Sequence, residues 1–396
     1  MATENKKYIP TLRFPEFQND GEWKRCKLSD VAVRKGKKNT KGIELPVYTN
    51  SATSGVISQE DYFDREIVTK ENLVNYGIIE PNDFVYNPRV SVTAPVGPIS
   101  RNKLSRGIMS PLYLIFGFNG GDINFFEHYF KGNSWHNYLR AKANYGARFD
   151  RINIGTKEFM DMPIPYPSLA EQKKVADCLS SLDKYIDATK RKLELLKEHK
   201  KGLMQRLFPA KGKTTPEIRF PEFQNDGEWV EVPFGSIINV NSGKDYKHLD
   251  VGNIPVYGTG GYMLSVNDRL SDIDAVGIGR KGTIDKPQYL KAPFWTVDTL
   301  FFLTSSKNYD IRYLYYLCQT IPWKTYGEQT GVPSISKNSI DKLDVVITTN
   351  LLEQQKIAQS LLHLDNAMDA IKRKIHLLET HKYGLMQNLF PNLNNY

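Results

Sequence analysis

The chain contains one unit twice, and this internal duplication constrains its fold more than any other feature. The stretch RFPEFQNDGEW occupies residues 13–23 and recurs unchanged at 219–229, 206 residues later. A second matching pair, LAEQKKVADCL from Leu169 and LLEQQKIAQSL from Leu351, is only 182 residues apart and continues without a gap to GLMQRLFP and GLMQNLFP. The second copy is therefore the first with shorter loops. Each copy joins a divergent part to a nearly constant part, which favours one scaffold carrying two specificities over a duplication without special purpose.

The nearly constant parts have the apolar pattern of a coiled coil. Apolar residues alternate at spacings of four and three, which gives the 3.5-residue average of a heptad repeat. In the first copy the predicted seam is Val175, Leu179, Leu182, Ile186, Thr189, Leu193, Leu196, Lys200, Leu203 and Leu207. In the second copy it is Ile357, Leu361, Leu364, Met368, Ile371, Ile375, Leu378, Lys382, Leu385 and Leu389. We interpret the two seam lysines as register devices rather than ligands.

The limits of both helices are also marked in the sequence. Ser168 and Asn350 each precede a glutamate by three residues, which is the spacing of a capping box. Pro209 and Pro391 follow the last seam residues, and proline ends a helix because it lacks an N–H and clashes with the preceding turn.

The two helices are expected to pair with each other in antiparallel orientation. Each apolar stripe needs a partner, because burial of one leucine or isoleucine stabilises by ~1.5–3 kcal/mol. The linker 210–218 can span at most about 30 Å, whereas a helix over 175–207 is roughly 50 Å long. The chain cannot return to the start of the first helix, so we expect one globular domain at each end of a rod. An intermolecular coiled coil is the alternative.

Residues 24–165 and 230–349 are expected to form α+β domains. Short β-rich runs alternate with turns in both, and each has one aromatic-rich helix, predicted over 124–143 and 310–326. We expect the aromatic side chains of these helices to belong to the core rather than to a contact surface.

Basic residues gather at Gly- and Ser-rich turns of both globular parts. Such loops suit DNA, because cations and backbone amides bind phosphate while arginine can read base edges. The formal charge of +9 also suggests a polyanionic partner. Solvated surface charge is the alternative for any single residue, but it is weaker where turns recur at matching places in both copies, as at Arg89 and Arg280. The candidate DNA-binding residues are Arg34, Lys35, Lys37, Lys38, Arg89, Ser91, Arg148, Arg151, Arg280, Lys281, Thr283, Ser336 and Lys337.

Several classes of site are not supported by the sequence. Cys26, Cys178 and Cys318 are scattered, which argues against a disulfide framework and a zinc site. Residues 277–282 match G-x-G-x-x-G but run into Pro287 without a helix, so we reject a nucleotide site there. No Walker loop and no [DNS]-P-P-[YFW] tetrapeptide of adenine methyltransferases is present. No apolar run approaches the ~20 residues of a membrane span, and the N-terminal residues lack a signal-peptide pattern. We therefore expect a cytoplasmic protein that binds without catalytic or metal-ligating residues of its own.

The whole arrangement resembles the specificity subunit of type I restriction–modification systems. The resemblance rests on the paired RFPEF…GEW stretches, the helix starts at 169–176 and 351–358, the GLMQxLFP helix ends, and the segments YGTGGY (257–262) and IGRKGTI (278–284). It implies that each variable domain reads one half of a split DNA site and that the helices set the gap. It also implies methylation subunits, two of them, that dock along the helices, and motor-nuclease subunits for restriction and translocation. S-adenosylmethionine, ATP and Mg²⁺ would belong to those partners, and no cofactor to this chain.

The resemblance and the repeat together predict α+β architecture with an internal pseudo-twofold repeat. We expect a first target-recognition domain over 1–165, including an arm over 1–12, and a second over 219–349. The expected helical regions are 166–209 and 350–391, with a linker at 210–218 and a tail at 392–396. A free-standing DNA-modifying enzyme and a coiled-coil scaffold without DNA are the alternative functions.

Overall fold

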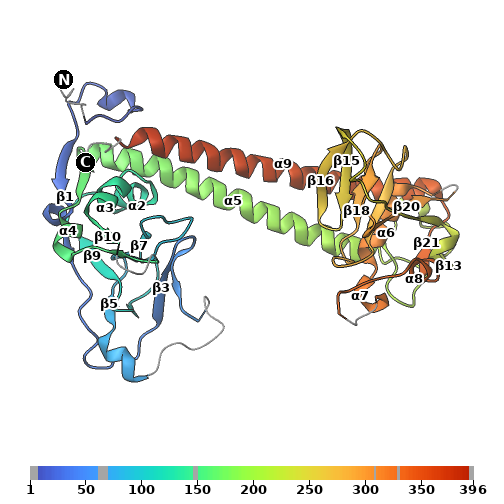
Figure 1. Ribbon diagram of the computed structural model, residues 1–396, viewed down its shortest axis with the longest axis horizontal. Coiled ribbons are helices and arrows are strands. Elements are labelled where there is room, and N and C mark those ends of the chain that lie inside the picture. Colours follow the sequence, from blue (N-terminus) through green and yellow to red (C-terminus); the bar gives the residue numbers. More distant parts are fainter. Residues whose placement is uncertain (1–7, 61–69, 146–149, 307–308, 328–330, 392–396) are drawn as a thin grey trace. The chain divides into compact units, whose positions relative to one another are not determined.

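The computed structural model describes residues 8–391 except 61–69, 146–149, 307–308 and 328–330. The chain divides into two units. Unit 1 is Met1–Ala188 with Ile375–Tyr396, and unit 2 is Thr189–Lys374. Two long helices, α5 (Leu169–Leu207) and α9 (Leu351–Leu389), contribute to both units, and Figure 1 shows them in green and red. Both begin at the repeated L-x-E-Q motif.

The globular part of unit 1 is a mixed domain with two four-stranded sheets. The orders are β2-β9-β6-β7 and β4-β3-β8-β5, and β1 pairs with β12. The strands are β1 (Lys24–Lys27), β2 (Ala32–Arg34), β3 (Val47–Ser51), β4 (Gly55–Ser58), β5 (Gly77–Ile79), β6 (Phe84–Tyr86), β7 (Ile99–Arg101), β8 (Gly107–Met109), β9 (Leu114–Phe118), β10 (Asn144–Tyr145), β11 (Ile152–Asn153) and β12 (Pro163–Tyr166). The helices are η1 (Pro15–Phe17), α1 (Leu28–Val31), η2 (Lys70–Asn75), α2 (Ile123–Lys131), α3 (His136–Lys142) and α4 (Thr156–Met160).

The globular part of unit 2 repeats this plan. Its sheets have the orders β14-β20-β17-β18 and β16-β15-β19, and β13 pairs with β21. The strands are β13 (Val230–Pro233), β14 (Ile238–Ser242), β15 (Val251–Gly258), β16 (Gly261–Val266), β17 (Ala275–Gly279), β18 (Gln288–Leu290), β19 (Trp295–Thr296), β20 (Leu300–Ser305) and β21 (Asp344–Ile347). The helices are η3 (Pro221–Phe223), η4 (Phe234–Ser236), α6 (Ile311–Thr320), α7 (Trp323–Tyr326) and α8 (Lys337–Asp341). The parallel pair β15–β19 corresponds to the parallel pair β3–β8 of unit 1.

The single aromatic-rich helix expected in each domain is wrong in its extent. Residues 124–143 form α2 and α3, because Gly132 ends α2 in extended conformation. Residues 310–326 form α6 and α7, which Pro322 separates. The expectation that their aromatic residues belong to the core is confirmed, since Phe125, Phe126, Tyr129, Tyr313 and Tyr316 are buried.

Each core takes in the end of one long helix. In unit 1 the Phe390 ring, which follows the end of α9, lies 5.2 Å from Phe125 and 6.5 Å from Trp23. In unit 2 the Phe208 ring, which follows the end of α5, stacks 5.5 Å from Tyr313 and lies 6.2 Å from Trp229. The repeated GLMQxLFP motif is therefore the anchor that holds a helix end in a globular core.

The long helices pair in antiparallel orientation within each unit. In unit 1 Asp183 of α5 forms an ion pair with Lys382 near the end of α9. In unit 2 Lys200 near the end of α5 pairs with Asp365 of α9 at 2.7 Å. Every residue of the predicted seam is buried or half-buried, including Thr189 and the two lysines. None of the helices formed by the described residues is both long and apolar enough for a membrane span.

Candidate nucleic-acid interface

The Arg280 turn of unit 2 is held against a second loop that precedes α8. The backbone N–H of Ile335 donates to the Arg280 carbonyl at 3.0 Å, and that of Gly282 donates to the Pro333 carbonyl at 2.8 Å. Gly282 has a φ of +83°, which favours glycine, and a Cβ at Gly279 would lie 2.1 Å from the Thr283 carbonyl oxygen. The turn is thus tight and fixed at both ends.

The side chains of these two loops divide into exposed cations and buried apolar residues. Arg280 and Lys281 are exposed, whereas Ile284 and Ile335 are buried. The Arg280 guanidinium also lies 5.9 Å from the Phe301 ring centre. An arginine whose backbone is fixed and whose guanidinium is exposed can contact a phosphate or the edge of a nucleobase.

The other candidate residues near this turn differ in exposure and in the contacts that they make. Thr283 is half-buried, and Lys337 is exposed at the first position of α8. The Ser336 hydroxyl caps α8 by accepting from the Ser339 N–H at 3.1 Å. The structure therefore gives Ser336 a helix-capping contact, while Arg280, Lys281 and Lys337 present charge.

The Arg89 loop of unit 1 is likewise held by backbone hydrogen bonds to a second segment of the chain. The Ile152 N–H donates to the Pro88 carbonyl at 2.9 Å, and the Val90 N–H donates to the Asp150 carbonyl at 3.0 Å. A β-bridge then joins Arg89 to Arg151. Two arginines that are 62 positions apart in the sequence are thereby brought side by side.

The remaining candidates around Arg89 differ in accessibility. Arg89 and Ser91 are exposed, and the Ser91 hydroxyl accepts from the Ala94 N–H at 3.1 Å, which closes the turn. Arg151 is half-buried, and its Nε lies 3.5 Å from the Asp150 carboxylate. Arg148 lies outside the described residues.

A second basic segment of unit 1 begins at Arg34, the last residue of β2, and continues into the following loop with Lys35, Lys37 and Lys38; all four side chains are exposed. Lys35 pairs with the buried Asp83 at 2.6 Å, so its charge is partly committed within the domain. Among the described residues, no hydrogen bond joins this loop to the Arg89 loop.

Sequence reasoning missed the counterpart of the β2 loop in unit 2. The counterpart follows β14, which pairs with β20 as β2 pairs with β9, and it exposes Lys244 and Lys247. Trp295 holds this loop by donating its indole N–H to the Lys244 carbonyl at 2.9 Å. Alignment of the two copies on RFPEF could have found it, because Gly36 and Gly243 are offset by nearly the same distance as that motif.

The repeated motifs themselves have structural roles that the sequence left open. Arg13 makes two hydrogen bonds to Glu171 at 2.7 and 2.8 Å, and Arg219 binds Glu353 with the same two distances. The next residue along each long helix, Gln172 or Gln354, accepts from the backbone N–H that starts α2 or α6. These contacts fix each long helix to its domain and leave the basic loops free to vary.

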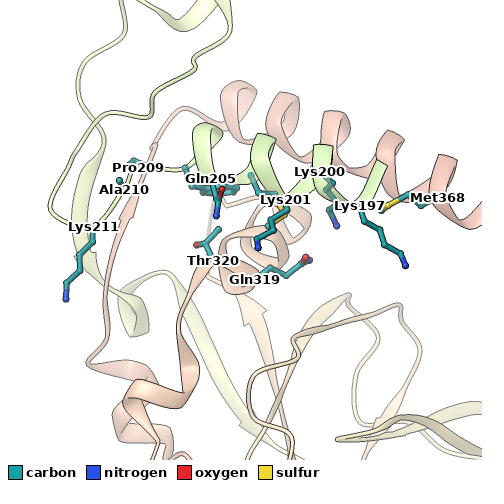
Figure 2. Close-up of a pocket in the computed structure, with 12 residues that line it drawn as sticks. Lys197, Lys200, Lys201, Gln205, Pro209, Ala210, Lys211, Gln319, Thr320 and Met368 are labelled. Carbon is teal, nitrogen blue, oxygen red and sulfur yellow. The ribbon is translucent and has the colours of Figure 1, made fainter. Parts of the chain in front are cut away.

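Unit 2 also contains a cavity of about 670 Å³ beside the end of α5. Figure 2 shows Lys197, Lys200, Lys201 and Gln205 of α5 around it, with Gln319 and Thr320 of α6 facing them. Its apolar lining comes from Met204, Phe208 and Met368. Lys200 is held by Asp365, whereas Lys201 and Lys211 are exposed.

Comparisons with known proteins agree with this two-unit plan. A family model described as the type I restriction modification DNA specificity domain matches residues 20–198 and 226–380. The chain is 24% identical over 440 aligned residues to the type I restriction enzyme MjaVIII specificity subunit of Methanocaldococcus jannaschii, covering 98% of this chain and 95% of that protein. It is 22% identical over 253 residues to the putative type I specificity subunit S.MgeORF438P of Mycoplasma genitalium, covering 61% of this chain and 65% of that protein.

Two solved structures share the fold. The S subunit of a type I restriction–modification system from M. genitalium has a TM-score of 0.61 at 17% identity, covering 97% of this chain and 99% of that chain. A chain solved in work on complex assembly and conformational transition of the type I system has a TM-score of 0.58 at 14% identity, covering 94% and 98%. Since the family model matches most of the sequence, once in each copy of the repeat, this protein belongs to the family of type I restriction–modification DNA specificity proteins.

Proposed function

We propose that this protein is the sequence-specificity subunit of a type I restriction–modification complex. Each globular domain reads one half of an asymmetric, two-part DNA site. The observation that carries the proposal is the recurrence of a braced arginine loop at matching places, Arg89 with Arg151 in unit 1 and Arg280 with Lys281 in unit 2. The sequences around the two loops differ, so the two half-sites should differ as well.

The chemistry of the loops suits duplex DNA. A guanidinium can donate two parallel hydrogen bonds to the O6 and N7 atoms of guanine, or to phosphate oxygens. Bracing by Ile152 and Ile335 lowers the entropy that an arginine loses on binding, because the loop backbone is already fixed. The helices α5 and α9 supply the spacing between half-sites and the docking surface for methylation subunits.

The remaining activities of the complex are assigned to partners. Two methylation subunits would bind S-adenosylmethionine and transfer the methyl group, and restriction subunits would use ATP and Mg²⁺ for translocation and cleavage. We assign no catalytic step and no cofactor to this chain. Purified chain with DNA, Mg²⁺ and S-adenosylmethionine should give no methylated or cleaved product, and any product would contradict this assignment.

The test is to map methylated adenines in cells that carry this protein with its partner subunits. The wild-type complex should methylate one asymmetric, two-part sequence. Arg280→Ala should weaken or relax reading of one half-site by about 1–3 kcal/mol, and Arg89→Ala should do the same to the other half only. Lys342→Ala, which removes an exposed charge just after α8 and outside the candidate residues, is the control and should leave both half-sites unchanged. If both arginine variants altered the same half-site, or neither altered any, the assignment of these loops would be wrong.

A further inference from the structure

The paired helices carry two aspartates in their seam region that occupy equivalent positions of the repeat. Asp183 and Asp365 are 182 residues apart, as are Lys200 and Lys382. Each aspartate pairs with the lysine of the other helix, and the Asp365 carboxylate accepts from Lys200 at 2.7 and 2.9 Å. The lysine side chains are only 12% and 17% exposed, so both pairs are largely removed from solvent.

Each of these aspartates is also contacted by a side chain of its own globular domain, through a hydrogen bond in unit 2 and an ion pair in unit 1. In unit 2 the Tyr316 hydroxyl of α6 donates to Asp365 Oδ2 at 2.7 Å. In unit 1 the Lys131 ammonium of α2 lies 3.6 Å from Asp183 Oδ2. The carboxylate is therefore constant in the two copies, while its partner is a hydroxyl donor in unit 2 and an ammonium group in unit 1.

The two donors come from the same face of equivalent helices. Asp122 and Asp310 cap α2 and α6, and alignment on these caps places His128 at the position of Tyr316 and Lys131 at that of Gln319. Residues three apart lie on one face of a helix. His128 does not reach Asp183 by a hydrogen bond; its Nε2 lies 3.0 Å from the Ser180 hydroxyl of α5 instead.

We propose that the Asp183 and Asp365 carboxylates fix the angle of each globular domain on the long helices, with Lys131 and Tyr316 as positioning residues for DNA reading. This inference rests on the proposed function. The Arg13–Glu171 and Arg219–Glu353 clamps hold each long helix at its first turn, whereas the apolar burial around Phe390 and Phe208 is not directional.

Asp183 and Asp365 lie 12 residues beyond the clamped glutamates, so each gives its helix a second point of attachment. The hydrogen bond from Tyr316 to the half-buried Asp365 carboxylate is directional and charge-assisted, and the Lys131–Asp183 ion pair attracts at the equivalent place. These contacts can therefore set an angle that a single clamp and apolar contact leave free.

The arrangement also explains why the donors can differ. The globular domains differ in sequence, but α5 and α9 carry an aspartate at the same position of the repeat. Each domain therefore needs only one donor or cation on the face of α2 or α6 that meets this aspartate. At Asp183, burial acts to raise the pKa, but the hydrogen bond from Lys382 and the charges of Lys382 and Lys131 together outweigh it, so the pKa is lowered.

The test uses the complete complex and measures the gap between methylated half-sites. Tyr316→Phe removes only the hydroxyl, so the half-site sequences should stay unchanged. Methylation of sites whose gap is one base pair longer or shorter should rise about tenfold, as expected for loss of one hydrogen bond to a charged group. The matched control is Tyr289→Phe, which removes a tyrosine–aspartate bond to Asp274 inside the same domain and should leave the gap unchanged.

Unit 1 offers a second pair of variants. Lys131→Met should widen the range of gap lengths that the complex methylates. Lys131→Arg should restore the wild-type range, because arginine keeps a cation at this position. Lys103→Met is the control, because Lys103 shares the Glu127 partner of Lys131 but does not contact Asp183. An unchanged gap in Tyr316→Phe and Lys131→Met, or equal broadening in the controls, would overturn the inference while the proposed function stood. Absence of site-specific methylation by the wild-type complex would instead refute the proposed function.

Discussion

At the scale of single residues, the repeated motifs are explained by ion pairs that anchor helices. Arg13 and Arg219 bind Glu171 and Glu353 through two nitrogens each, and all four side chains are less than 10% exposed. A planar fork of this kind cannot be replaced by lysine without loss of one bond. The attachment of the helices is therefore sufficient to explain why the two copies have the same arginine and glutamate, and no contact of these residues with DNA is required.

Glu127 provides a prediction of pH dependence at this scale. It lies on α2 with Lys103 at 2.7 Å, Lys131 at 2.9 Å and Arg101 at 3.3 Å. Burial acts to raise its pKa, but Lys131 and Lys103 outweigh burial and lower the pKa to about 2. Because the folded pKa is depressed, the stability that Glu127 contributes is present above its ordinary pKa of 4.5 and is lost as pH falls towards 2.

Glu127→Gln should therefore lower the free energy of unfolding by about 3 kcal/mol at pH 7. The difference from the wild type should shrink between pH 4.5 and pH 2. Urea unfolding across this pH range measures both effects. A difference that stayed constant with pH would mean that the Glu127 charge does not contribute.

At the scale of elements, the seam charges favour the antiparallel helix pair over a parallel one. If the equivalent helices ran parallel in register, Lys200 would face Lys382 and Asp183 would face Asp365, and buried like charges repel. In antiparallel orientation each lysine meets an aspartate instead. These ion pairs support the interpretation of the two lysines as register devices, because each lysine has an aspartate of the other helix as its partner.

A charge exchange tests this pairing. Lys200→Asp should destabilise unit 2 by about 3 kcal/mol, because it buries a second carboxylate beside Asp365. The double variant Lys200→Asp with Asp365→Lys should recover more than half of that loss. Lys197→Asp is the control on the same helix, since its exposed pair with Glu194 should contribute less than about 1 kcal/mol. Denaturant unfolding of each variant gives the coupling, and additive effects in the double variant would argue against a specific pair.

At the scale of the whole molecule, the same attachment between a globular domain and the long helices occurs twice. The clamp, the glutamine contact and the apolar helix-end anchor occur in both units with matching geometry. The variable loops lie outside these contacts. Divergence of the loops therefore leaves the attachment unchanged.

Exchange of residues 24–165 for the corresponding domain of another family member should change one half-site only. The other half-site and the gap should be retained, provided that the new domain has a donor for Asp183. Adenine methylation mapping in cells reads out all three features. A change in both half-sites would show that the domains do not read independently.

The sequence by itself determined the duplication, the coiled coil and the α+β class, because repeats and apolar periodicity are local properties that survive any folding of the chain. It also placed the aromatic residues of the predicted domain helices in the core. It missed the breaks at Gly132 and Pro322, where single residues outweigh a continuous pattern.

Only the tertiary structure decided which distant residues meet. It joined Arg89 to Arg151, Arg13 to Glu171, and the seam aspartates to Tyr316 and Lys131. The role of the basic loops in reading DNA stays a prediction. Contacts of this kind depend on the angle at which packed elements meet, and no periodicity along the chain encodes that angle.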